Sequence, residues 1–117
     1  MYEVISGERD VNRVAVDTFK RQVASGENIL EVEAGTNGYK GDNFGHASRT
    51  YIRLQNIMDT DMRVKETHDS DGNVDGFVLE MAGDSELTTI INALKFVVKV
   101  LDEQRREVVG GSTWNGP

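Results

Sequence analysis

The segment from Gly83 to Glu107 constrains the fold more than any other, because it joins a clear helix start to a long run of apolar residues at helical spacing. Asp84 is a favourable N-cap, and Glu86 places negative charge in the first turn, where the helix dipole prefers it. Arg105 and Arg106 stand in the last turn, which prefers positive charge. A helix of this length must bury its apolar side, so the chain needs a second layer to cover it.

The apolar arc of this helix is broader than one packing contact usually requires. We expect the side that covers a sheet to consist of Leu87, Ile90, Ile91, Leu94, Val98 and Leu101. The residues that widen the arc are Ala93, Phe96, Val97 and Val100. Exposed patches of several large apolar side chains are unusual on monomers, and a two-fold dimer is the commonest way to cover one. We therefore expect a homodimer formed through the C-terminal helix, with cover by a first helix as the alternative.

Alternation of apolar and polar residues predicts four strands, at about residues 30–34, 49–55, 62–65 and 77–81. The connection between the last two, HDSDGNVDG, is rich in residues that suit a hairpin turn. The links between consecutive strands are short enough for an antiparallel meander.

The segment 11–25 is expected to be a helix. Its apolar residues are Val11, Ala15, Val16, Phe19 and Val23, with Asp10 as N-cap and Gly26 as terminator. The order helix, four strands, helix predicts an α+β two-layer sandwich, in which a four-stranded antiparallel meander carries both helices on one face. We expect one domain over residues 1–109 and a flexible tail over 110–117.

Composition excludes several classes of protein. The chain has no cysteine, so it offers no disulfide framework, no thiol nucleophile and no cysteine-based metal site. A net charge of -7 disfavours nonspecific attraction to duplex nucleic acid or anionic lipid. No apolar segment approaches the roughly twenty residues needed to span a bilayer, and the N-terminus lacks a secretory pattern. We expect a cytoplasmic protein.

A glycine-rich loop at residues 35–46 separates the first two predicted strands, with Gly35, Gly38, Gly41 and Gly45 in eleven residues. Loops of this length in small domains are uncommon unless they bind something or are disordered. Glycines let backbone N–H groups approach an anion, but neither common nucleotide-binding motif is present. A structural or interface role and a ligand-binding role both stay open.

The candidate binding residues lie in this loop and on the strand after it: Tyr39, Lys40, Asp42, His46, Arg49, Tyr51 and Arg53. The last three alternate with apolar residues, so they are expected to point away from the core. Together with Arg63 and Lys65 they make a basic strip on an acidic protein. Pairing across strands with Glu31, Glu33 or Glu80 is the alternative explanation for this strip.

The sequence gives little support for a catalytic site or a metal site. His46 and Ser48 lie near Asp42, but there is no nucleophile elbow, and a triad normally assembles from distant positions. Asp71, Asn73, Asp75 and Gly76 match half of a calcium loop, yet Ala82 occupies the position where glutamate is required. We expect a turn there, and we expect no enzyme activity, no metal and no cofactor.

A resemblance to a group of other proteins rests on two segments, GTNGYKGDNFGHASRTYIR and GDSELTTIINALKFVVKVL. Over residues 29–102 the chain resembles a group of small uncharacterised proteins encoded by Gram-positive bacteria (Firmicutes) and their phages. In that group Gly-Asp-x-Gly-His precedes Arg-Thr-Tyr, and Gly-Asp-Ser-Glu-Leu opens the last helix. Here the loop, Gly41 to His46, is one residue longer. The resemblance implies an origin in a phage or mobile element and brings no activity with it.

The sequence therefore favours a non-enzymatic binding or accessory protein that self-associates. Its expected recognition surface is the loop 35–46 with the strand of Arg49, Tyr51 and Arg53. The alternative is a phage- or mobile-element-encoded protein that sequesters a small anionic, nucleotide-like ligand or inhibits a host defence protein.

Overall fold

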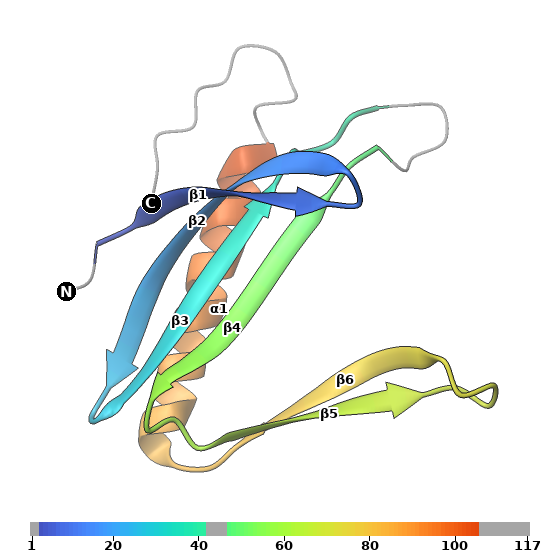
Figure 1. Cartoon of the computed structure of the whole chain (residues 1–117). Coiled ribbons are helices and arrows are strands. Elements are labelled where there is room, and N and C mark those ends of the chain that lie inside the picture. Colours follow the sequence, from blue (N-terminus) through green and yellow to red (C-terminus); the bar gives the residue numbers. More distant parts are fainter. Residues whose placement is uncertain (1–2, 42–46, 106–117) are drawn as a thin grey trace.

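The computed structural model describes residues 3–41 and 47–105, which contain six strands followed by one helix (Figure 1). The elements are β1 (Ile5–Val11), β2 (Val14–Ser25), β3 (Asn28–Thr36), β4 (Thr50–Met58), β5 (Met62–His68), β6 (Val74–Met81) and α1 (Asp84–Arg105). No helix in this part of the chain has both the length and the apolar content to cross a bilayer.

The strands form two separate antiparallel sheets. β1 to β4 make a meander in the order β1-β2-β3-β4, while β5 and β6 pair with each other in a second, two-stranded sheet. The prediction of an α+β fold with an antiparallel sheet is confirmed, but the layout differs. Of the four predicted strands, only β3 and β4 belong to the larger sheet. The other two form a hairpin, called the arm below (residues 62–81), which extends away from the sheet and the helix in Figure 1.

The helix predicted for residues 11–25 is wrong. The segment contains the end of β1, a two-residue turn and β2. Asn12 and Arg13 have positive φ angles of 48° and 71°, the conformation that tight hairpin turns require. The spacing looked helical because β2 changes its buried face: Thr18 is buried on one side of the sheet and Val23 on the other. The buried positions therefore switch from even-numbered to odd-numbered residues along β2. As a result, the spacing of apolar residues in the sequence falls between the two-residue period of a strand and the period of a helix.

β3 is the centre of the larger sheet and buries both of its faces. Leu30, Val32 and Ala34 are fully buried on the side that α1 covers, called the helix face. Glu33 and Gly35 are buried on the opposite side, called the polar face. The β1–β2 hairpin bends over the polar face, so that β1 lies near β4 (Figure 1).

α1 packs across β2 and β3 and is held by polar contacts near each end. The hydroxyl of Thr89 donates a buried hydrogen bond to the side chain of Asn28. Near the other end, the Gln104 amide donates to the carbonyl of Asp17 at 2.9 Å and accepts from the backbone N–H of Thr36 at 3.0 Å. These contacts fix the position of the helix along the sheet, because shifting it would leave buried polar groups without partners.

The packing of α1 reverses most of the predicted assignment of its faces, although Ile90 and Leu101 pack against the core as expected. The residues expected to be surplus, Ala93, Phe96, Val97 and Val100, are buried against the sheet. Four residues expected in the core, Leu87, Ile91, Leu94 and Val98, are exposed. Ala93 allows close approach to the sheet, and Thr89 and Gln104 stand on the same side at helical spacing, where they reach backbone and side-chain partners.

Candidate assembly surface

The outward side of α1 carries a continuous apolar stripe. Leu87, Ile91, Leu94 and Val98 follow one another at intervals of three and four residues, so they line one side of the helix. Each leaves between 43 and 65% of its surface in solvent. Single exposed aliphatic residues are ordinary, but a contiguous patch indicates an interaction surface. We call these four residues the outer stripe.

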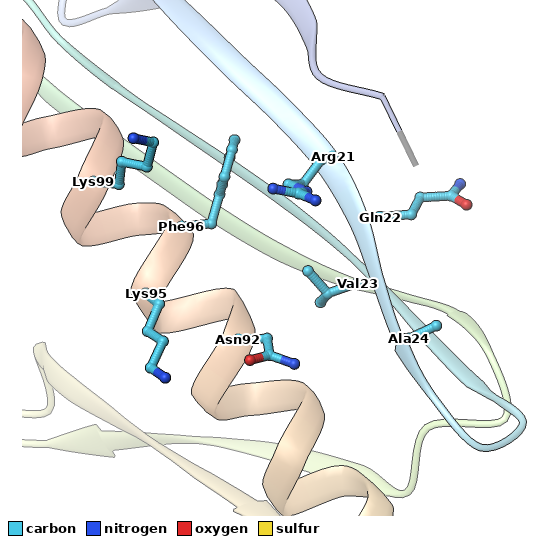
Figure 2. Close-up of a pocket in the computed structure, with 8 residues that line it drawn as sticks. All are labelled: Arg21, Gln22, Val23, Ala24, Asn92, Lys95, Phe96 and Lys99. Carbon is cyan, nitrogen blue, oxygen red and sulfur yellow. The ribbon is translucent and has the colours of Figure 1, made fainter. Parts of the chain in front are cut away.

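A basic groove runs beside the outer stripe, between α1 and the end of β2 (Figure 2). Its volume is about 530 Å³, and it is lined by Arg21, Gln22, Val23, Ala24, Asn92, Lys95, Phe96 and Lys99. The guanidinium of Arg21 lies over the ring of Phe96, 5.6 Å from its centre. Lys95 and Lys99 border both the groove and the stripe, so the two features form one surface that is apolar along one line and positively charged along the next.

The groove also adjoins an open edge of the sheet. Pairing between β1 and β2 begins at Ile5 and Lys20, so within the described residues the segment 21–25 of β2 has no partner on that side. Free strand edges can accept another chain, and here the edge lies next to a positively charged cavity.

The arm is amphipathic. Residues that pair directly across a hairpin share one face, and the pairs Met62–Met81, Val64–Leu79 and Glu66–Phe77 place five apolar side chains on the same side. We call Met62, Val64, Phe77, Leu79 and Met81 the apolar arm face. The other side carries the pairs Arg63–Glu80 and Lys65–Val78.

Within the described part of the chain, the arm is attached to the rest of the molecule at its base. Met62 packs against the core, and the N–H of Asp61 donates to the Glu86 carboxylate at 3.1 Å. The N–H of Ala82 donates to the carbonyl of Asp61 at 3.3 Å. Farther out, Phe77 is 70% exposed and Val64 is also exposed. The outer part of the arm therefore presents an apolar face to solvent.

The turn at the tip of the arm is a compact hairpin connection, as the sequence predicted. The Asp69 carboxylate accepts hydrogen bonds from the N–H groups of Asp71 and Asn73, at 2.9 and 3.0 Å. Gly72 has a φ of 85°, which glycine adopts without strain. Over residues 3–41 and 47–105, no group of three or more His, Cys, Asp or Glu residues is placed to hold a metal ion.

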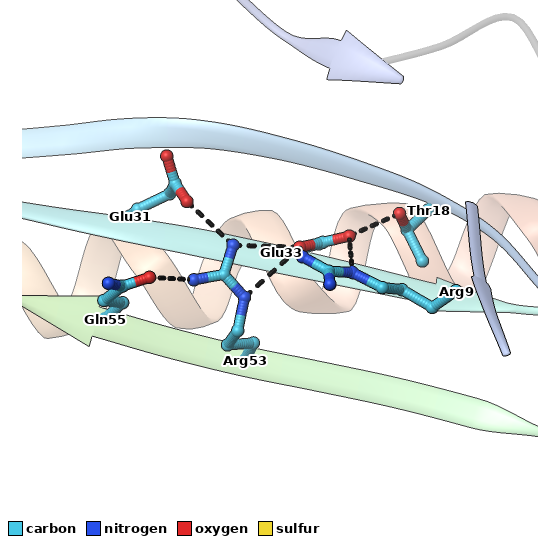
Figure 3. A network of polar contacts seen from close by, with 6 residues as sticks. All are labelled: Arg9, Thr18, Glu31, Glu33, Arg53 and Gln55. Carbon is cyan, nitrogen blue, oxygen red and sulfur yellow. Dashed lines mark hydrogen bonds and ion pairs between the residues drawn. The ribbon is translucent and has the colours of Figure 1, made fainter. Parts of the chain in front are cut away.

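The predicted basic strip is divided between two sheets, with Arg53 on β4 and Arg63 and Lys65 on the arm. Acidic side chains pair with these three residues, and Figure 3 shows the contacts of Arg53. Arg53 forms ion pairs with Glu31 at 2.7 Å and Glu33 at 2.9 Å, and it also donates a hydrogen bond to Gln55. On the arm, Lys65 pairs with Glu80 at 3.0 Å. The explanation by pairing across strands is therefore confirmed for Arg53 and Lys65.

Glu33 lies at the centre of this network on the polar face. Arg9 reaches it from β1, and Thr18 donates a hydrogen bond to it at 2.6 Å. The hydrogen bond from Arg9 lowers the pKa of Glu33 to about 2, assisted by Thr18 and Arg53 and opposed by burial. The guanidinium of Arg9 also lies 5.3 Å from the centre of the Tyr51 ring. Sequence analysis did not identify Arg9 as part of the site. The available signal was Asn12, which with Arg13 lies between the β-branched residues Val11 and Val14, a pattern typical of a hairpin turn. Such a turn brings the strand of Arg9 back onto the sheet.

The remaining predicted site residues lie at the base of the glycine-rich loop or outside the described residues. Tyr39 and Lys40 are exposed, and the Tyr39 hydroxyl accepts a long contact of 3.5 Å from Arg105. The N–H of Arg49 donates to the Asn37 side chain at 2.6 Å, which closes the base of the loop. Asp42 and His46 lie outside the described residues.

A cavity of about 150 Å³ lies between the base of the loop and the end of α1. Its lining consists of Thr36, Gly38, Tyr39, Ser48, Thr50, Leu101 and Arg105. Of the predicted site residues, Tyr51 and Arg53 thus belong to the polar network, and Tyr39 borders this separate cavity.

No family model matches the chain, and comparisons with curated proteins and with solved structures find no similar protein. Evidence on function therefore comes from the surfaces described above.

Proposed function

We propose that this protein is a non-enzymatic binding or accessory subunit that self-associates through α1. The observation that carries the proposal is the outer stripe, four large aliphatic side chains in a row on the side of the helix that faces away from the sheet. The fold itself does not use them, because Ala93, Phe96, Val97 and Val100 already supply the contact with the sheet.

Association would remove this apolar area from water. Burying one aliphatic side chain fully contributes about 1.5–3 kcal/mol, so covering four half-exposed side chains contributes several kcal/mol before the cost of association. Lys95 and Lys99 beside the stripe favour a partner with acidic groups next to an apolar surface.

We also propose the loop 35–46 as a recognition surface for a further partner. Its exposed described side chains are Tyr39 and Lys40. In this proposal Tyr51 and Arg53 act indirectly, because they belong to the network that shapes the sheet beneath the loop.

The experiment is a measurement of molar mass by light scattering or sedimentation at micromolar concentration. We expect the wild-type chain to exceed the monomer mass and Leu94→Glu to remain folded as a monomer. Thr88→Glu is the matched control, since it adds the same charge at an exposed position of α1 outside the stripe. A monomeric wild-type chain would overturn the proposal, as would association that Leu94→Glu leaves unchanged.

A second function, sequestering a small anionic, nucleotide-like ligand, is favoured by one observation. The groove brings Arg21, Lys95 and Lys99 to one cavity on an acidic protein. Such a role would suit the proposed origin in a phage or mobile element. A thermal shift with a panel of nucleotides tests it, because a ligand at a hundred times its dissociation constant adds about 2.7 kcal/mol of stability. Lys95→Glu should abolish any shift.

A further inference from the structure

We infer that the outer stripe of α1 is covered by the apolar arm face of a second copy of this chain. The inference rests on the proposed self-association and names its partner surface. It joins two apolar surfaces that are exposed among residues 3–41 and 47–105 and that the fold holds apart within one molecule.

The first reason for this inference is the exposed apolar face of the arm. An isolated two-stranded hairpin is at best marginally stable in water unless its apolar face packs on something. Beyond its base, β5 and β6 contact mainly each other. The contacts of Asp61 and Met62 hold the base beside the start of α1, and Figure 1 shows the arm pointing away from its own helix. The arm therefore does not cover the outer stripe of its own chain.

The dimensions of the two surfaces agree. From Leu87 to Val98 the outer stripe extends about 16 Å, at 1.5 Å per residue of helix. From Phe77 to Met81 the apolar arm face extends about 13 Å, at 3.3 Å per residue of strand. A helix lying on a twisted antiparallel surface is also the packing that α1 uses on its other side, against β2 and β3.

The charges around the two surfaces are complementary. Lys95 and Lys99 lie beside the outer stripe on its groove side, where Lys99 also pairs with Glu103 at 3.0 Å, and Arg21 lies in the adjoining groove. Glu66 stands opposite Phe77 on the apolar side of the arm. Acidic residues outnumber basic ones over the arm and its flanking turns. The acidic residues are Asp59, Asp61, Glu66, Asp69, Asp71, Asp75 and Glu80. An arm placed on the stripe brings opposite charges together, whereas an arm placed on another arm brings like charges together.

Area favours the same pairing over a symmetric contact between two helices. A standard stable interface buries about 800 Å² per partner, and four half-exposed aliphatic side chains supply well under that. A contact of helix with helix would also leave both apolar arm faces in water. Placing the arm on the stripe covers both surfaces in one contact, and reciprocal exchange of two arms closes a two-fold dimer, whereas one-way contacts produce a ring or filament.

The test uses one variant for each surface. Phe77→Glu disables the arm and Leu94→Glu disables the stripe, and each alone should weaken association by at least about tenfold. Mixed together, they should form a one-to-one heterodimer, because an intact arm on one chain meets an intact stripe on the other. Val78→Glu is the matched control, since Val78 adjoins Phe77 on the opposite side of the arm and should leave association unchanged.

The outcomes separate this inference from the proposed function. If Phe77→Glu associates like the wild type while Leu94→Glu is monomeric, the helix associates without the arm, and the inference is overturned while the proposed function stands. If the mixture of the two variants stays monomeric, the inference also fails. A wild-type chain that is monomeric overturns both.

A crosslinking experiment protects the test against misfolding of the glutamate variants. The chain has no cysteine, so single cysteines introduced by Phe77→Cys and Leu94→Cys report on their own contact alone. We expect a mixture of these two proteins to form a disulfide-linked heterodimer on oxidation, and Val78→Cys with Leu94→Cys to form at least about tenfold less. Equal yields from both mixtures would overturn the inference.

Discussion

The carboxylate of Glu33 accepts two hydrogen bonds from the guanidinium of Arg9, at 2.7 and 2.9 Å, although β1 and β3 are separated by β2 in the sheet. The contact exists because the β1–β2 hairpin bends over the polar face and brings Arg9 above β3. It ties the first strand to the centre of the sheet and stabilises the charged form of a buried carboxylate.

This contact predicts a specific acid dependence of stability. The folded-state pKa of Glu33, about 2, lies below its ordinary value of 4.5, so its stabilising contribution is present above pH 4.5 and is lost as the pH falls toward 2. The loss should be on the order of 3 kcal/mol in the free energy of unfolding. Urea unfolding between pH 7 and pH 2 measures it. Glu33→Gln should be less stable at pH 7 and should lose much of this dependence, whereas Glu80→Gln, in an exposed pair with Lys65, should behave like the wild type. An unchanged acid dependence in Glu33→Gln would contradict the assignment.

Gly35 allows β2 to bend close to β3, and this predicts a sharp effect of a single methyl group. A Cβ at Gly35 would lie 2.3 Å from the carbonyl oxygen of Asp17 and 2.8 Å from the Cα of Thr18, both backbone atoms. Gly35→Ala should therefore destabilise the protein by roughly 1–3 kcal/mol, the usual cost of overpacking, or by more. Gly7→Ala is the control, because Gly7 also pairs with Thr18 but its Cβ would meet only side-chain atoms, the nearest at 3.3 Å. Equal melting temperatures for the two variants would argue against a close approach at Gly35.

Gln104 predicts a similar penalty next to Gly35, because it bonds Thr36 and the same Asp17 carbonyl. Its amide satisfies the N–H of Thr36 and the carbonyl of Asp17, and Gln104 itself is buried. Gln104→Leu keeps the size of the side chain and removes both hydrogen bonds, leaving the buried N–H of Thr36 unsatisfied at a cost of about 1–3 kcal/mol. Arg105→Leu, at the adjacent exposed position, should change stability little. Thermal unfolding compares the two, and a neutral Gln104→Leu would mean that water replaces the amide.

Some elements could be predicted from the sequence because one local signal dominated. β3 and β4 showed a clean alternation, and α1 began at Asp84 as its capping residues indicated. The prediction for segment 11–25 failed because β2 has buried residues on both faces of the sheet, and the resulting spacing of apolar residues imitates a helix.

The candidate site depended on information that local patterns do not contain. α1 is apolar around most of its circumference, so periodicity could not say which side meets the sheet, and the buried hydrogen bonds of Thr89 and Gln104 decide it. The alternation in β5 and β6 identified two strands but not the sheet they join. Arg9 and Glu33 meet only because the hairpin bends, which depends on tertiary packing.

Val97 and Val98 are chemically identical neighbours on α1, and they predict opposite outcomes for the same substitution. Val97 is 6% exposed and packs against the sheet, whereas Val98 is 65% exposed on the outer stripe. Val97→Glu should unfold the protein or lower its melting temperature strongly, because burying an unpaired carboxylate costs several kcal/mol, a large part of the 5–15 kcal/mol that usually stabilises a domain. Val98→Glu should leave the melting temperature of the monomer nearly unchanged and reduce self-association. Circular dichroism and sedimentation on the two variants measure both effects. A folded Val97→Glu together with an unfolded Val98→Glu would mean that α1 packs on the sheet through its other side, and the proposed assembly surface would then be part of the core.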